Sequence, residues 1–204
     1  MIQPGYSVLI KISVMKYYKW IVIVTVLISG CARHTDTDKY ERLVKKELAR
    51  NVREDSLFLG IKFGMTSKGF YAHCWELNKK GLITDGNDNT AVLYKLGKEL
   101  SHPVSMNFYP DFHENKIYKM RVDFKYDSWA PWNKNLFADS LQLDVVKLYK
   151  KWYGTNNFIK MTDSVKGTIF IKVDANRRII IGRYDDLHVK VDYTDLLVDK
   201  EFKK

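Results

Sequence analysis

Hydrophobic and polar positions alternate most clearly in residues 116–126 (KIYKMRVDFKY). Met120, Val122, Phe124 and Tyr126 fall on one parity, while Lys119, Arg121, Asp123 and Lys125 fall on the other. A period of two with one polar face is typical of a strand in an antiparallel sheet. Shorter runs of the same kind predict further strands at residues 56–63, 82–84, 91–96, 104–109, 158–161, 168–173, 178–183 and 188–193.

Three segments have helical character instead. Residues 38–53 have helix-forming composition, and residues 66–80 carry Phe70, Cys74 and Leu77 at helical spacing, with Thr66 or Ser67 as cap and Gly81 just past the end. The third helix is predicted to open at Pro131 and to end at Gly154. Its expected buried face consists of Phe137, Leu141, Val145, Leu148 and Trp152.

The order of these elements is a helix followed by about four strands, written twice. The pseudo-repeats cover about residues 56–126 and 127–204, with no residue-level identity between them. The sequence therefore predicts an α+β fold, in which an antiparallel sheet carries helices packed on one face. Residues 31–55 are predicted to form a tether and a partly packed helix in front of the domain, which covers residues 56–204.

An apolar run near the N-terminus belongs to none of these elements. Lys16 and Lys19 precede residues 20–27, which are apolar apart from Thr25, and Ser29 and Gly30 then lead into Cys31. Basic, apolar and small residues in this order are typical of a secretory signal peptide over residues 15–30. The alternative is an uncleaved anchor, although the run is short for a membrane span of about 20 residues.

The tetrapeptide Ile28-Ser29-Gly30-Cys31 resembles the lipobox of bacterial lipoproteins. This resemblance implies cleavage before Cys31, a diacylglyceryl group on its sulfur and an acylated amine. In some bacteria, an aspartate directly after the lipidated cysteine retains a lipoprotein in the inner membrane. Here Ala32 follows Cys31, so the expected location is the outer membrane, facing either the periplasm or the surface. Residues 1–14 precede Met15 and are predicted to be an upstream extension, with the start at Met1 or Met15 left open.

Two weaker resemblances concern the domain itself. The element order resembles the β-lactamase-inhibitor-protein-like arrangement. Residues 60–70 (GIKFGMTSKGF) resemble the G-x-x-x-G-M-[ST] entry of small outer-membrane assembly lipoproteins. Both resemblances imply an α+β binding or scaffold module of the cell envelope.

The charge of the chain fits several kinds of partner. The net charge is +10, and removal of the first 30 residues would leave 31 basic against 24 acidic side chains. The lysines are scattered along the sequence, which favours the interpretation that the positive charge serves solubility alone. Anionic lipid, anionic glycan or an acidic envelope protein are the candidate partners, and nucleic acid is not expected. If Cys31 carries lipid, Cys74 has no disulfide partner within the chain.

Candidate catalytic residues are few. Asp111, His113 and Glu114 in one predicted loop could serve as metal ligands or a general base, but such loops are more often solvated turns. Asp185, Asp186 and His188 could form a base or ligand pair, and hairpin-turn chemistry is the favoured interpretation. No catalytic site, metal site or cofactor is therefore predicted.

Aromatic residues in YDSWAPW provide the candidate contact site: Tyr126, Trp129 and Trp132. Such rings either bind a sugar or a partner, or pack over the start of the following helix. We expect Trp132 to be structural and Trp129 to be the more exposed. The leading hypothesis is a non-enzymatic, lipid-anchored envelope protein. The alternatives are a glycan-binding surface lipoprotein using Trp129 and Trp132, and a hydrolase using the Asp111 cluster.

Overall fold

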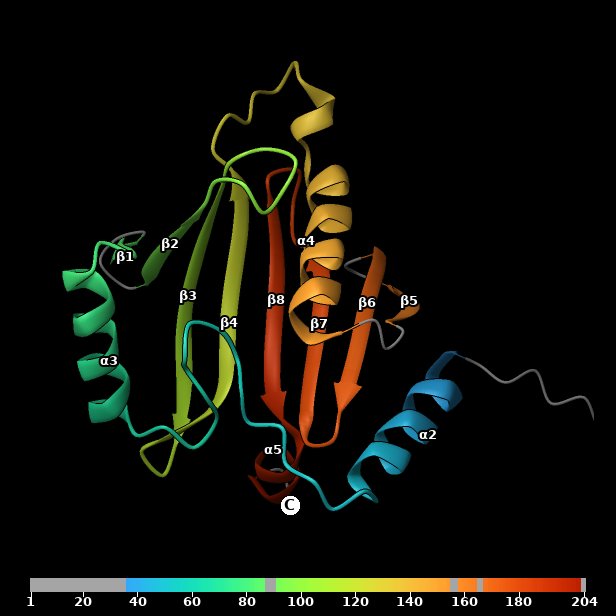
Figure 1. Cartoon of the computed structure of the whole chain (residues 1–204). Helices are drawn as coiled ribbons and strands as arrows, with labels where there is room; N and C mark the ends of the chain where they lie inside the picture. Colours follow the sequence, from blue (N-terminus) through green and yellow to red (C-terminus); the bar gives the residue numbers. More distant parts are fainter. Residues whose placement is uncertain (1–35, 87–90, 155–157, 165–166, 203–204) are drawn as a thin grey trace, which may run out of the picture. The chain divides into compact units, whose positions relative to one another are not determined.

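The computed structural model describes residues 36–86, 91–154, 158–164 and 167–202. These residues contain an eight-stranded antiparallel sheet with strand order β1-β2-β3-β4-β8-β7-β6-β5 (Figure 1). The elements along the chain are α2 (Asp36–Leu48), α3 (Ser67–Lys79), β1 (Ile83–Asp85), β2 (Val92–Leu96), β3 (Val104–His113), β4 (Lys116–Tyr126), the 3-10 helix η2 (Lys134–Leu136), α4 (Ala138–Tyr153), β5 (Ile159–Asp163), β6 (Gly167–Asp174), β7 (Arg177–Arg183), β8 (His188–Asp195) and α5 (Leu196–Phe202).

The predicted α+β fold and its repeated pattern are confirmed, but the helices do not all pack on one face of the sheet, because α2 and α5 lie on the face opposite α4. Helix α3 precedes β1 to β4, α4 precedes β5 to β8, and each set of four strands forms an antiparallel meander. The two meanders join through β4 and β8, which pair from Lys119↔Thr194 to Lys125↔His188. The last strand of each meander, β4 or β8, therefore lies at the centre of the sheet, and the short strands β1 and β5 form its edges.

The main core lies between the sheet and α4. The predicted inward parity of β4 is buried, with Met120, Val122, Phe124 and Tyr126 all almost fully covered. Helix α4 contributes Leu141, Val145 and Leu148 to the same core, while the ends of its predicted face, Phe137 and Trp152, are half-buried.

Helix α4 begins later than predicted, at Ala138 and not at Pro131. Between them lies η2, in which the Asn135 amide donates to the side-chain oxygen of Asn133 at 3.3 Å. The Ala138 amide donates to the carbonyl of Asp186, 2.9 Å away, in the loop between β7 and β8. This tertiary bond fixes the point at which the helix can start.

Helix α3 follows its local signals closely. The hydroxyl of Thr66 accepts a hydrogen bond from the Gly69 amide at 3.1 Å, and Gly81 follows the helix with a φ of 66°. Phe70 and Leu77 are buried, whereas Cys74 is half-buried against the core. A side-chain N-cap and a left-handed glycine are the expected boundaries of such a helix.

The strand predicted at residues 56–63 is absent, which corrects that prediction. The segment forms a tight turn in which Leu59 and Gly60 both have positive φ, at 51° and 78°. The Ile61 amide donates to the Phe58 carbonyl at 2.9 Å, as in a type I′ turn. Among the described residues, the only antiparallel pairing in this segment is across the turn itself, at the isolated bridge between Ser56 and Lys62. Leu57, Phe58, Ile61 and Phe63 are nevertheless buried, so the hydrophobic run reflects burial in the core and not a strand of the sheet.

Strand β3 is longer than predicted. It runs to His113, and the turn consists of Glu114 and Asn115, with φ values of 47° and 61°. Asp111 and His113 therefore belong to a strand and not to a solvated loop. The backbones of β3 and β4 stay paired up to His113 and Lys116, so the hairpin continues beyond the apolar residues of the predicted strand at 104–109.

Helix α2 and the C-terminal helix add a second, smaller cluster. Tyr40, Leu43 and Leu48 pack with Ile171 of β6 and with Leu196 of α5. Because Phe170 belongs to the main core and successive side chains of a strand point to opposite faces, this cluster lies on the other face of the sheet. Helix α5 was not predicted. The compact unit that contains the sheet comprises Tyr40–Lys204.

Candidate functional site

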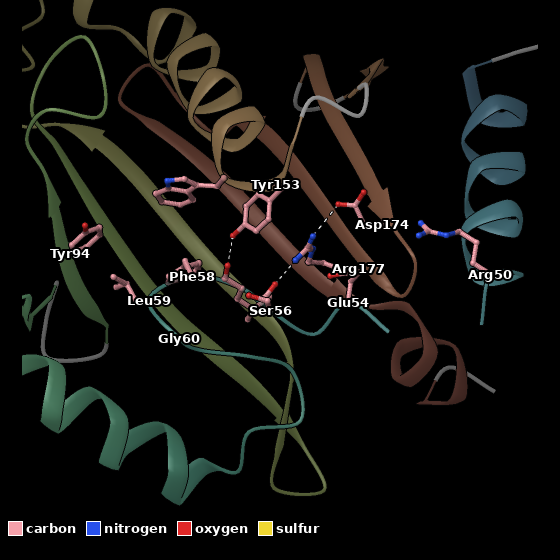
Figure 2. Close-up of a pocket in the computed structure, with 12 residues that line it drawn as sticks. Arg50, Glu54, Ser56, Phe58, Leu59, Gly60, Tyr94, Tyr153, Asp174 and Arg177 are labelled. Atoms are coloured by element: carbon pink, nitrogen blue, oxygen red, sulfur yellow. Dashed lines mark hydrogen bonds and ion pairs between the residues drawn. The ribbon is translucent and has the colours of Figure 1, made fainter. Parts of the chain in front are cut away.

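A cavity of about 720 Å³ opens on the α4 side of the sheet (Figure 2). We call it the groove. It brings together residues from five separate segments of the chain. They are Arg50, Glu54, Ser56, Leu57, Phe58, Leu59, Gly60, Tyr94, Trp152, Tyr153, Asp174 and Arg177. Its volume falls in the range of small-molecule sites, about 300–1,000 Å³.

The groove has an apolar part and a charged part. Figure 2 shows Tyr94, Leu59 and Phe58 towards one end, with Arg177, Asp174 and Arg50 towards the other. Tyr153, from the C-terminal end of α4, lies between them. The arrangement suits a ligand that has both apolar surface and hydrogen-bonding groups.

Arg177 contacts three of the segments that line the groove. Its guanidinium donates to the carbonyl of Ser56 and to the carboxylate of Asp174, 3.1 Å away. The same group lies 4.6 Å from the ring centroid of Tyr153, a cation–π contact. Arg177 is almost fully buried, so it ties the turn segment, the sheet and α4 to one another.

The neighbouring Asn176 fixes the start of the turn segment. Its side-chain oxygen accepts from the Glu54 amide at 2.7 Å, and its amide group donates to Asp55 at 3.2 Å. The β6–β7 turn therefore positions residues 54–56 through side chains. This explains how an irregular segment can line a defined cavity.

Tyr153 supplies a neutral hydroxyl to the same network. It donates to the Leu57 carbonyl at 2.7 Å and lies 2.8 Å from the hydroxyl of Tyr193. Burial raises the pKa of Tyr153 to about 12. The hydroxyl is therefore protonated at neutral pH and holds the turn segment as a hydrogen-bond donor.

Most charges in the groove are paired. Arg50 contacts Glu47 at 2.5 Å, and Asp174 contacts buried Lys172 at 2.9 Å as well as Arg177. Glu54 differs, because its half-buried carboxylate has no hydrogen bond or ion pair with any residue that the structure describes.

Tyr94 at the apolar end also has an unused polar group. Within the described residues its hydroxyl has no hydrogen-bond partner, although the ring is partly buried on the core side of β2. Burial raises the pKa of Tyr94, which keeps the hydroxyl protonated. The groove thus offers a free carboxylate and a free hydroxyl to a ligand.

The aromatic residues predicted from the sequence are not brought together as one exposed surface. Tyr126 is 1 % exposed, and its hydroxyl donates to Asp144 at 2.8 Å, so it is a core residue and not a contact residue. Trp129 packs on the core, with its ring 5.8 Å from that of Phe137, whereas Trp132 is 85 % exposed. The expected exposure of the two tryptophans was therefore the wrong way round.

The physical reason lies in the late start of α4. Residues 131–137 form a connection whose regular part is the short 3-10 helix η2, and the ring of Phe137, just before α4, packs against that of Trp129 at an angle of 34°. Trp132 lies outside this contact and points away from the core. A helix beginning at Pro131 would instead have drawn Trp132 into its first turn.

The two polar clusters make structural contacts. Asp111 pairs with Arg121 on the neighbouring strand at 2.8 Å. Asp185 accepts from the amides of Leu187 and His188 at 2.8 and 2.7 Å, as the hairpin interpretation predicts. Its carboxylate also lies 2.8 Å from Nδ1 of the His188 ring, which is the pairing that the alternative interpretation predicts. Burial acts to raise the pKa of Asp185, but these bonds and the His188 ring outweigh it and lower the pKa. Among the described residues, no group of three or more His, Cys, Asp or Glu is placed to hold a metal ion.

The two cysteines differ in what can be said of them. Cys31, the predicted lipid attachment residue, lies outside the described residues. Cys74 is a free thiol on α3, and burial raises its pKa to about 11. Its thiol is therefore protonated at neutral pH and packs as a small apolar group.

Comparisons with protein-family models, with curated proteins and with solved structures find no match. No helix in the part of the chain that the structure describes is both long and apolar enough to cross a membrane.

Proposed function

We propose that this protein is a non-enzymatic, lipid-anchored protein of the bacterial outer membrane that binds an envelope component in the groove. The observation that carries the binding role is the pair of unpartnered polar groups, on Glu54 and Tyr94, lining one cavity with aromatic walls. Both groups are half-buried and face the cavity, so a ligand in the groove can form hydrogen bonds with them directly.

The contacts of the candidate catalytic groups support a binding role over an enzymatic one. Asp111 is engaged by Arg121, and Asp185 by its own turn. In the groove, Arg177 and Asp174 hold the turn segment and each other. These groups act as structural partners in the fold, which leaves recognition as the role that the free groups can perform.

The envelope location is supported by the signal-peptide pattern and by the motif Ile28-Ser29-Gly30-Cys31. A lipid on Cys31 would hold the domain at the membrane surface. From there the groove could reach a component of the membrane, of the periplasm or of the cell surface.

Replacing Cys31 with alanine is expected to stop lipid attachment and to leave an unprocessed or released chain. The measurement is incorporation of labelled palmitate, followed by fractionation of the envelope and partition into detergent. The matched control is Cys74→Ala, which should keep both the label and the outer-membrane location. Continued lipid labelling of the Cys31→Ala chain would contradict the anchor.

A further inference from the structure

The chemistry of the groove narrows the class of ligand, if the proposed binding role is correct. Its lining contains two positive residues, Arg50 and Arg177, and two negative ones, Glu54 and Asp174. Three of the four already form ion pairs within the protein, so an anionic group would have to compete with Glu47 for Arg50 and with Asp174 for Arg177, whose Nε is the guanidinium nitrogen left without a hydrogen-bond partner among the described residues. An anionic ligand would also meet the free carboxylate of Glu54.

A cationic ligand fits only one point of the site. It could pair with Glu54, but it would also lie near the guanidinium groups of Arg50 and Arg177. Like charges in a partly buried site disfavour such a ligand. The free groups are instead matched by hydroxyls, which donate to the carboxylate of Glu54 and either donate to or accept from Tyr94.

An extended peptide is disfavoured by the backbone of the groove. Peptides usually bind along a sheet through free main-chain groups. Here the carbonyls of Ser56, Leu57 and Leu59 already accept from Arg177, Tyr153 and His73, and the Leu57 amide donates to Ile61. The groove therefore presents side chains, not an open strand edge.

The aromatic walls complete the pattern. Trp152 and Tyr153 line the groove together with Phe58, and Tyr94 lies at its apolar end. Aromatic rings combine apolar faces with polar tips, which suits ligands that have apolar C–H faces and a polar rim. Sugar rings have this construction, and their hydroxyls supply donors and acceptors at the same time.

We infer that the groove binds a neutral oligosaccharide. Glu54 accepts hydrogen bonds from ring hydroxyls, the Tyr94 hydroxyl bonds to a second point of the chain, and the aromatic residues contact the apolar faces of the rings. This assignment rests on the proposed binding function and does not use Trp129 or Trp132.

The test uses the full chain, purified with its membrane anchor in mild detergent, and isothermal titration calorimetry. The probes are the neutral hexasaccharides of glucose (maltohexaose and cellohexaose) and of N-acetylglucosamine, the anionic hexagalacturonate, and hexalysine. We expect at least one neutral probe to bind more tightly than both charged probes. Glu54→Ala should weaken that binding at least tenfold, because it removes a charge-assisted hydrogen bond.

Matched controls separate the groove from the rest of the surface. Tyr94→Phe removes one hydroxyl and should weaken binding about fivefold, whereas Tyr184→Phe alters an exposed tyrosine outside the groove and should not. Glu76→Ala, on the exposed side of α3, is the control for Glu54→Ala. Thermal unfolding of each variant confirms that the fold is retained, as expected because Glu54 and Tyr94 lose no internal hydrogen bond within the described residues and Glu76 and Tyr184 are exposed.

Three results would overturn the assignment. The first is no binding of any neutral probe at 10 mM, which is on the order of the weakest affinities worth calling specific. The second is tighter binding of hexalysine or hexagalacturonate, and the third is an equal loss of binding in the control variants. A photo-crosslink formed at Tyr94 in intact cells, together with one of these results, would reject the sugar assignment and leave the binding function in place.

Discussion

Replacing Arg177 with alanine is expected to lower the free energy of unfolding by about 3–5 kcal/mol, the usual cost of removing one partner from a buried ion pair. The change removes the donor to the Ser56 carbonyl and the cation–π partner of Tyr153. It also removes one of the two ion pairs that Asp174 makes with buried cations and leaves the pair with Lys172. Urea unfolding of the purified chain, followed by circular dichroism, measures the effect.

The control for this variant is Arg183→Ala on the same strand. Arg183 pairs with Asp139, whose side chain is largely exposed, and exposed pairs contribute about 0–1 kcal/mol. A loss at Arg177 no larger than the loss at Arg183 would contradict its role as the residue that holds the groove. The turn segment would then have to be positioned by its apolar side chains alone.

Replacing Leu148 with alanine is expected to cost about 2–5 kcal/mol, the range for truncating a buried leucine. Leu148 is 2 % exposed in the core between α4 and the sheet. Chemical unfolding of the variant and the parent chain gives the difference directly. The loss should appear as a lower midpoint with an unchanged slope.

Leu143 offers a control on the same helix. It is 54 % exposed, so Leu143→Ala keeps helix propensity while removing little packing, and its effect should stay within about 0.5 kcal/mol. If Leu148→Ala changed stability by less than that amount, this face of α4 would not be packed on the sheet. The layer arrangement would then be wrong.

Local signals were enough for the elements whose boundaries are set locally. Strand β4 has the same bounds as its alternating segment, and from Lys119 onwards the sheet buries one parity and leaves the other half-covered or exposed. The start of the strand departs from the pattern, because Ile117 is buried and Tyr118 is half-buried. Helix α3 begins after the Thr66 cap and is followed by Gly81, as its cap residues predict. The doubled order of helix and strands followed from these elements.

Tertiary contacts decided the elements that the sequence misassigned. The segment at residues 56–63 is apolar enough for a strand, but Arg177, Asn176 and Tyr153 hold its backbone in a turn instead. The start of α4 depends on a bond from Ala138 to the distant Asp186. Periodicity contains no information on such bonds, so neither outcome could be predicted from the sequence.

The groove could not be predicted for a related reason. Glu54 and Tyr94 are 40 positions apart in a sequence without a local motif, and only the fold places them in one cavity. The one local signal was the aromatic pair at the end of α4, Trp152 and Tyr153, of which Trp152 was assigned to the core. The more visible pair, Trp129 and Trp132, is divided between core and solvent.

Photo-crosslinking in intact cells tests most directly whether the groove is the binding site. The full chain carries the photo-reactive residue p-benzoylphenylalanine in place of Tyr94, which lines the groove, or in place of Tyr184, which is exposed outside it. After irradiation, the chain is purified and its mass is compared with that of an unirradiated sample. We predict a discrete adduct at position 94 that is absent at position 184 and is lost when Glu54→Ala is added. An adduct at position 184 with none at position 94 would contradict the groove as the site of binding.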